Sequence, residues 1–135
     1  MSRRHQLGRG RSRVLAVCLP ALAALCFACG ERFLDPPAAL PDGNPELGRE
    51  AIVHYGCGSC HIIPGIRQAD SGVGPPLIAW SERAFVGGRL PNTPGNLIRW
   101  IRNPQEVDPG SPMPNLDVSE AEARHIAAYL LTLRQ

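Results

Sequence analysis

The chain contains no lysine, and aromatic residues are scarce, with three Phe, two Trp and two Tyr among 135 residues. Glycine and proline are abundant, at 14 residues each. A chain of this length is expected to form one domain, yet so few large apolar rings can fill only part of its core. The composition therefore predicts that a bound apolar group completes the interior.

The cysteines do not indicate a disulfide framework. Of the five cysteines, only Cys57 and Cys60 lie in the part of the chain that we expect to fold. They belong to the run Cys57-Gly58-Ser59-Cys60-His61, a C-x-x-C-H pattern that is typical of c-type haem attachment. Each thiol can add to one haem vinyl group, and the histidine becomes an axial ligand of the iron. We therefore predict one haem c, covalently bound through Cys57 and Cys60.

Two other uses of a C-x-x-C pair are disfavoured. Structural zinc needs two further ligands, and the sequence has no second C-x-x-C and no H-x-x-x-H pattern. A thioredoxin-like redox pair needs a strand–helix–strand context, which the sequence does not indicate.

Residues 1–29 are predicted to be a signal peptide rather than part of the fold. Five arginines precede an uncharged, mostly apolar run of 16 residues from Val14 to Cys29. A membrane-spanning helix needs about 20 apolar residues, so this run fits a secretory signal better.

The end of this segment predicts a membrane anchor. Ala28-Cys29-Gly30 resembles a bacterial lipoprotein cleavage site, with Cys29 as the lipidated first residue, although Cys26 stands where leucine is usual. An uncleaved N-terminal anchor and a soluble secreted form are the alternatives, and Cys29 can also be merely the end of the apolar run. All three forms export the domain, which we expect on the periplasmic or extracytoplasmic side of a membrane.

Removal of residues 1–28 changes the charge of the chain. The whole sequence has 14 arginines and 12 acidic residues, for a formal charge of +2. The segment holds five arginines and no acid, so nine arginines remain against 12 acids, a charge of −3. The apparent basicity is therefore no reason to expect a nucleic-acid partner. Without lysine, a docking face for a redox protein must consist of arginines, acids and the haem edge.

The remaining chain divides into a tether and a helical domain. Residues 30–44 are Pro-rich, lack apolar periodicity and are expected to form an extended tether. The domain is expected at 45–135. Capping and helix-stop signals predict helices over 45–55, from Thr93-Pro94 to Pro104, and from Ser119 onward. No segment alternates convincingly as a strand, so the fold class is predicted to be all-α.

Five segments follow the C-x-x-C-H motif in order: Gly74-Pro75-Pro76-Leu77, 90–101, Asn103-Pro104-Gln105, 109–114 and Ala128-Tyr129-Leu130. This ordered set resembles a class I cytochrome c, most closely the cytochrome c domain fused to subunit II of some haem–copper oxidases. The resemblance covers about residues 44–135 and implies a cytochrome c-like fold, with three to four helices wrapped around one haem. The sequence has no copper-binding domain or transmembrane hairpin upstream, so we expect a free-standing or tethered carrier.

Met113 is predicted to be the second axial ligand of the iron. It is the only methionine besides Met1, and it lies between prolines in a loop without helix or strand periodicity. A His/Met pair is usual in electron-transfer cytochromes and raises the reduction potential. The rival ligands are His54, which lies too close to the cysteines, and His125, which is expected to be a solvated histidine on the polar face of the last helix. A buried loop methionine remains the alternative for Met113.

The resemblance also implies roles for residues around the histidine. The Pro75 carbonyl is expected to accept a hydrogen bond from Nδ1 of His61 and so to orient the ring. Leu77 is expected to pack on the proximal side of the haem. Gly48 and Tyr129 are expected to mark the place where the first and last helices cross.

Trp100 and Arg83 are expected near the haem propionates, with Arg89 as the alternative to Arg83. For Trp100, its spacing from Leu97 and Ile101 also suits a core residue. Both interpretations can hold, because a buried indole needs a partner for its N–H.

A haem with two protein ligands leaves no position for a substrate. The expected function is therefore one-electron transfer, not enzymatic catalysis, in an extracytoplasmic respiratory chain. Redox partners such as a terminal oxidase or a quinol-oxidising complex are expected, with the protein as a monomer or a subunit of a respiratory complex. The alternatives are a haem-c sensor or small-molecule-binding protein with a labile distal ligand, and a dedicated electron-wiring subunit of one redox enzyme.

Overall fold

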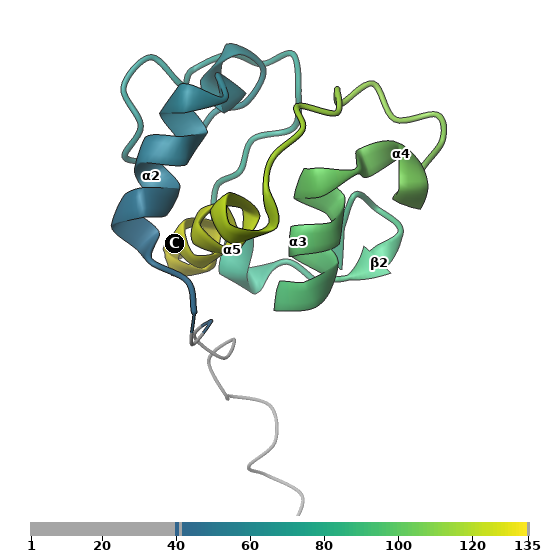
Figure 1. Ribbon diagram of the computed structural model, residues 1–135. Coiled ribbons are helices and arrows are strands. Elements are labelled where there is room, and N and C mark those ends of the chain that lie inside the picture. Colours follow the sequence, from purple (N-terminus) through teal and green to yellow (C-terminus); the bar gives the residue numbers. More distant parts are fainter. Residues whose placement is uncertain (1–39, 41, 135) are drawn as a thin grey trace, which may run out of the picture. The chain divides into compact units, whose positions relative to one another are not determined.

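Four α-helices, joined by irregular segments, frame the part of the chain that the structure describes (Figure 1). The computed structural model describes Leu40 and residues 42–134, so the expected signal peptide and most of the expected tether lie outside the described residues. The helices are α2 (Pro45–His54), α3 (Pro94–Arg102), α4 (Pro104–Val107) and α5 (Glu120–Thr132). The predicted all-α fold with three to four helices is confirmed.

Each of the three long helices begins where its capping residue predicts. The side chain of Asn44 accepts a hydrogen bond from the backbone N–H of Leu47 at 3.0 Å. Thr93 caps α3 and Ser119 caps α5 in the same way. Such caps satisfy backbone donors that the first helical turn leaves unpaired.

The connecting segments contain short elements that the sequence did not predict. Cys57–Ser59 and Trp80–Glu82 form single 3₁₀ turns, η1 and η2. Strands β1 (Phe85–Val86) and β2 (Leu90–Pro91) pair antiparallel across a tight turn. Strands of two residues are too short to show an alternating pattern in a sequence, which is why the pattern analysis missed them.

Pro104 ends one helix and begins another. The prediction that α3 stops before Pro104 is confirmed, because α3 ends at Arg102. The short helix α4 was not predicted. Proline interrupts a helix interior but suits the first turn, where its missing N–H would have no partner in any case.

Helices α2 and α5 cross in close contact, as Figure 1 shows in blue and yellow. A Cβ atom at Gly48 would lie 2.0 Å from the backbone oxygen of His125 and 3.0 Å from Cβ of Tyr129. The predicted crossing point is therefore confirmed, and glycine is required there for steric reasons. The apolar stripe of α5 is buried, and its members are Ala123, Ile126, Ala127, Leu130 and Leu131.

His125 lies on the polar face of α5 and is partly exposed, as predicted. It is not solvated on all sides, because its Nδ1 accepts a hydrogen bond from the backbone N–H of Asn44 at 3.0 Å. On the same face of α5, Glu122 accepts a hydrogen bond from the Tyr55 hydroxyl at 2.8 Å. Hydrogen bonds from Ser119 and from Tyr55 lower the pKa of the Glu122 carboxyl. The close approach of α2 at Gly48 therefore covers part of this polar face, which helical periodicity alone assigns to solvent.

No helix among the described residues is long and apolar enough to span a bilayer.

Replacement of Gly48 by alanine is expected to lower the free energy of unfolding by about 1–3 kcal/mol, because the added methyl group must push α2 away from α5. Gly95→Ala is the matched control, since Gly95 lies in α3 and a Cβ there meets nothing within 4 Å. The control is expected to be neutral or stabilising by no more than about 1 kcal/mol. Urea denaturation of both holoproteins measures the difference, and equal stability of the two variants contradicts the steric role of Gly48.

Candidate functional site

The structure contains a cavity of about 520 Å³, a volume typical of sites for small molecules and cofactors. Its lining draws together segments that are far apart in the sequence, from the C-x-x-C-H motif to the end of α5. Every cofactor-binding residue predicted from the sequence lines this cavity, and they are Cys57, Cys60, His61, Pro75, Leu77, Arg83, Trp100 and Met113.

The cysteine pair lies on the turn that follows α2. Gly56 adopts a left-handed conformation with φ +67°, which glycine tolerates without steric cost, and directs the chain into η1. The backbone N–H groups of Cys60 and His61 both donate to the carbonyl of Cys57, at 3.2 and 3.0 Å. Both thiols are free. This compact turn presents two thiols and an imidazole along the same cavity wall.

The raised pKa of the Cys57 thiol argues against a thiol redox centre. Burial raises the pKa of the Cys57 thiol above its usual value, and the nearby Cys60 adds to the effect. Redox-active and nucleophilic cysteines instead have lowered pKa values, because the thiolate is the reactive form.

The ring of His61 is fixed on its Nδ1 side. Nδ1 lies 2.7 Å from the carbonyl oxygen of Pro75, and because a carbonyl can only accept, Nδ1 carries the proton. This leaves Nε2 as the nitrogen that can bind a metal, an arrangement that orients histidine ligands in many metal sites. The backbone N–H of Gly74 donates to the Cys60 carbonyl at 2.7 Å, and this bond holds the Pro75 loop against the motif.

Gly74 is a functional residue that the sequence analysis named only as part of a motif. A Cβ atom there would lie 2.6 Å from Cε1 and 2.8 Å from Nδ1 of His61. The imidazole therefore lies directly against the backbone of Gly74. Only the structure reveals this contact, because nothing in the local pattern distinguishes Gly74 from the other glycines of the same loop.

Met113 reaches the cavity on a loop held by side chains. Its backbone N–H donates to Oγ of Ser111 at 3.2 Å, and its carbonyl accepts from Nε2 of Gln105 at 2.6 Å. The structure thus brings His61 and Met113, 52 positions apart in the sequence, to one cavity.

The remaining lining is mainly apolar. Trp80, which the sequence analysis did not select, is 4% exposed, and its indole N–H has no partner among the described residues. The guanidinium of Arg83 lies 4.9 Å from the centre of the Trp80 ring and donates to the carbonyls of Pro76 and Ile78. Several buried aliphatic side chains complete the wall, and they are Ile52, Ile63, Leu97, Ile101, Val118, Ile126 and Leu130.

Trp100 and Arg89 differ in their relation to the cavity. The ring of Trp100 lines it and packs against Gly87, where a Cβ atom would lie 2.6 Å from the indole. Arg89, the alternative propionate partner, instead forms an ion pair with Asp108 at 3.2 Å. Of the two arginines, Arg83 is the one that lines the cavity.

This donor set fits a covalently attached haem. Two thiols, one oriented imidazole and one thioether meet in a mainly apolar cavity with an arginine at its edge. Haem iron in c-type cytochromes takes histidine and methionine as axial ligands. The cavity is the place where such an apolar group would complete the core.

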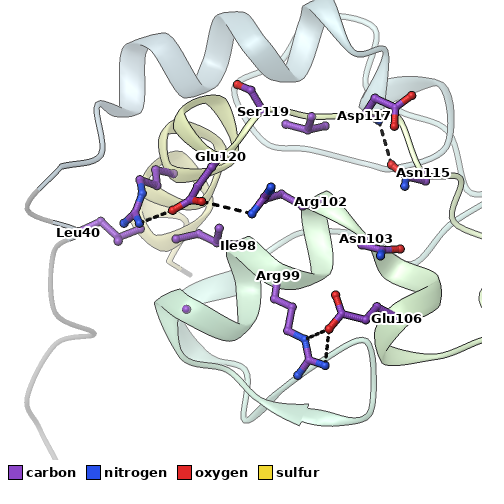
Figure 2. A pocket seen from close by; sticks show the side chains of 13 residues that line it. Leu40, Ile98, Arg99, Arg102, Asn103, Glu106, Asn115, Asp117, Ser119 and Glu120 are labelled. Carbon is purple, nitrogen blue, oxygen red and sulfur yellow. Dashed lines mark hydrogen bonds and ion pairs between the residues drawn. The ribbon is translucent and has the colours of Figure 1, made fainter.

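A second depression, of about 740 Å³, has a different character (Figure 2). It runs along α3, α4 and the beginning of α5, and ion pairs dominate its lining. Arg99 contacts Glu106 at 2.6 Å, and Glu120 bridges Arg102 and Arg124 at 3.3 and 2.7 Å. With Asp117, three arginines and three acids line the depression, so their formal charges sum to zero, and no cysteine, histidine or methionine lines it.

Comparison with known proteins gives relatives of one kind. No family model matches the chain. The chain is 35% identical over 88 residues to cytochrome c oxidase subunit 2 of Alkalihalophilus pseudofirmus. The matched region covers 64% of this chain and 25% of that protein. It is 29% identical over 89 residues to cytochrome c oxidase subunit 2 of a Bacillus species, with 63% and 25% covered. The chain therefore spans about a quarter of the length of these relatives.

Among solved structures, cytochrome c2 from Rhodobacter sphaeroides matches with a TM-score of 0.49 and 21% identity, covering 68% of this chain and 97% of that one.

We expect Gly74→Ala to reduce the fraction of purified protein that carries haem, because the new methyl group displaces the His61 ring from the Pro75 carbonyl. Gly72→Ala is the matched control in the same loop, since a Cβ there meets nothing within 4 Å. The ratio of haem absorbance to polypeptide, measured for both variants, checks the prediction. Equal haem content in the two variants would show that the contact with Gly74 does not matter.

Proposed function

We propose that this class I c-type cytochrome, a relative of the cytochrome domain of oxidase subunit II, carries single electrons through a haem with two protein ligands. The observation that carries the proposal is the cavity that His61 and Met113 line together with both cysteines of the C-x-x-C-H motif. The haem, when bound, supplies the reversible one-electron chemistry of its iron.

Each side chain has a separate task in this proposal. Cys57 and Cys60 hold the haem through thioether bonds to its vinyl groups. His61 and Met113 bind the iron, with the Pro75 carbonyl keeping the histidine ring in place. With both His61 and Met113 as ligands, the site would leave no place on the iron for a substrate, and the bound haem would supply one-electron chemistry only.

The edge of the cavity is proposed to hold the propionates. Arg83 supplies a positive charge there, and stacking on Trp80 together with hydrogen bonds to Pro76 and Ile78 fixes its side chain. Trp100 lines the same cavity and is the second candidate. A carboxylate beside a fixed guanidinium is stabilised in its charged form, which supports Arg83 as the principal propionate partner.

The proposed setting is the extracytoplasmic side of a membrane, where the carrier accepts electrons from a quinol-oxidising complex and passes them to a terminal oxidase. The relatives' name, cytochrome c oxidase subunit 2, supports an oxidase as partner or as host complex. Cys29, which ends the expected signal peptide and lies outside the described residues, is proposed to carry a lipid anchor, and residues 30–44 are proposed to form the tether.

Met113→Ala tests the ligand pair. The oxidised parent protein is expected to show the weak sulfur-to-iron charge-transfer band at the red end of the visible spectrum, and the variant is expected to lose it. The reduced variant is also expected to bind carbon monoxide readily, because one axial position becomes vacant. Leu116→Ala, at an exposed cavity-lining residue of the same segment, is the control and is expected to keep the band.

A contrary result in the same experiment favours a sensor. If the parent protein lacks the band and its reduced form binds carbon monoxide readily, Met113 is not a stable ligand and the carrier proposal is wrong.

The anchor is tested by mass spectrometry of the mature protein from membranes. We expect a mature N-terminus at Cys29 that carries a diacylglyceryl group, and we expect Cys29→Ser to release the haem protein into the soluble extracytoplasmic fraction. An unmodified Cys29 in the membrane-bound protein rejects the lipoprotein anchor and leaves electron transfer untouched.

A further inference from the structure

We propose that Gln105 is a positioning residue for the methionine ligand, because it fixes the loop that presents Met113 to the iron. The inference rests on the proposed function, in which Met113 is an axial ligand. It assigns a task to α4, the short helix that the sequence did not predict.

The amide group of Gln105 makes two hydrogen bonds to the methionine loop. Nε2 donates to the carbonyl of Met113 at 2.6 Å and to the carbonyl of Ser111 at 3.3 Å. A primary amide nitrogen has two hydrogens, so both donors are used on the same loop. Gln105 itself is half-buried, and water therefore competes less for these hydrogen bonds than at an exposed site.

The chemistry of the loop explains why a side chain is needed. Met113 lies between Pro112 and Pro114, neither of which has a backbone N–H to donate. The N–H of Met113 is held by Oγ of Ser111 at 3.2 Å, and its carbonyl is held by Gln105. Both backbone polar groups of the proposed ligand are therefore fixed by side chains, in a segment where regular backbone pairing is not available.

The backbone that carries Gln105 is held in place. Its predecessor Pro104 is almost fully buried and anchors the first turn of α4. The beginning of the loop is also held, because Asp108 accepts from the N–H of Gly110 and from Arg89. The glutamine amide thus connects a fixed helix to the residue whose sulfur must keep one position.

Loss of these bonds lowers the free energy needed to swing Met113 away from the iron. An external ligand such as imidazole competes with Met113 for the same axial position, so its affinity measures how firmly the loop is held. Two hydrogen bonds to carbonyls are involved, and their removal is expected to raise imidazole affinity about tenfold.

The test is Gln105→Leu in the holoprotein, which keeps most of the side-chain volume and removes both donors. We expect imidazole to bind the oxidised variant about tenfold more tightly, with a weaker sulfur-to-iron band and a lower reduction potential. Glu106→Gln is the matched control on the next residue of α4. It removes the ion pair with Arg99 without contacting the loop, and it is expected to keep the parental affinity and band.

Gln105→Glu provides a second variant, which also serves if Gln105→Leu does not fold. A charged carboxylate can donate no hydrogen bond to the two carbonyls. We therefore expect this variant, like Gln105→Leu, to bind imidazole more tightly than the parent protein at neutral pH and to show a weaker sulfur-to-iron band.

The outcomes separate the inference from the proposed function. If Met113→Ala loses the band while both Gln105 variants keep the parental band and imidazole affinity, Met113 is the ligand and the role of Gln105 is rejected. If Met113→Ala keeps the band of the parent, the ligand assignment fails and the inference fails with it.

Discussion

The contact between α2 and α5 at Gly48 is the constraint on which the rest of the site depends. The backbone of α2 lies against the backbone of α5 because no side chain separates them at this point. The direction in which α2 ends determines where Gly56 turns the chain into the C-x-x-C-H motif. The same contact orients the stripe of α5, so that Ile126 and Leu130 form part of the cavity wall. The cysteines and the apolar wall are thus positioned by one helix crossing.

Local signals were sufficient to predict the framework. Asn44, Thr93 and Ser119 cap helices at the positions that their side chains favour, since a cap is a contact between residues three apart and can be read from a short segment. The candidate ligands could also be predicted from the sequence. The C-x-x-C-H spacing is local, and Met113 is the only methionine besides Met1. The structure brings those residues to one cavity, which local patterns alone could not show.

Contacts over long sequence separations account for what the sequence analysis missed. The polar face of α5 that carries His125 is partly covered by α2, because helical periodicity identifies the apolar face but not what packs on the polar one. Gly74 faces the His61 ring and Trp80 lines the cavity for reasons that involve neighbours elsewhere in the chain. Likewise, a helix-stop signal at Pro104 says nothing about a new helix, and Gln105 acquires its partners only when the chain returns at Met113.

The ion pairs along α3 and α5 have a consequence for the way in which other proteins approach this one. Arg99 pairs with Glu106, Arg102 and Arg124 share Glu120, and Asp117 in the same depression balances the remaining positive charge. The Debye length is about 8 Å at physiological ionic strength, so such compensated charges produce little field beyond the surface. This face therefore does little to orient an approaching protein electrostatically before contact. Orientation during diffusional encounter must arise from other parts of the surface, and this side of the molecule can turn toward a partner or a membrane without an electrostatic preference.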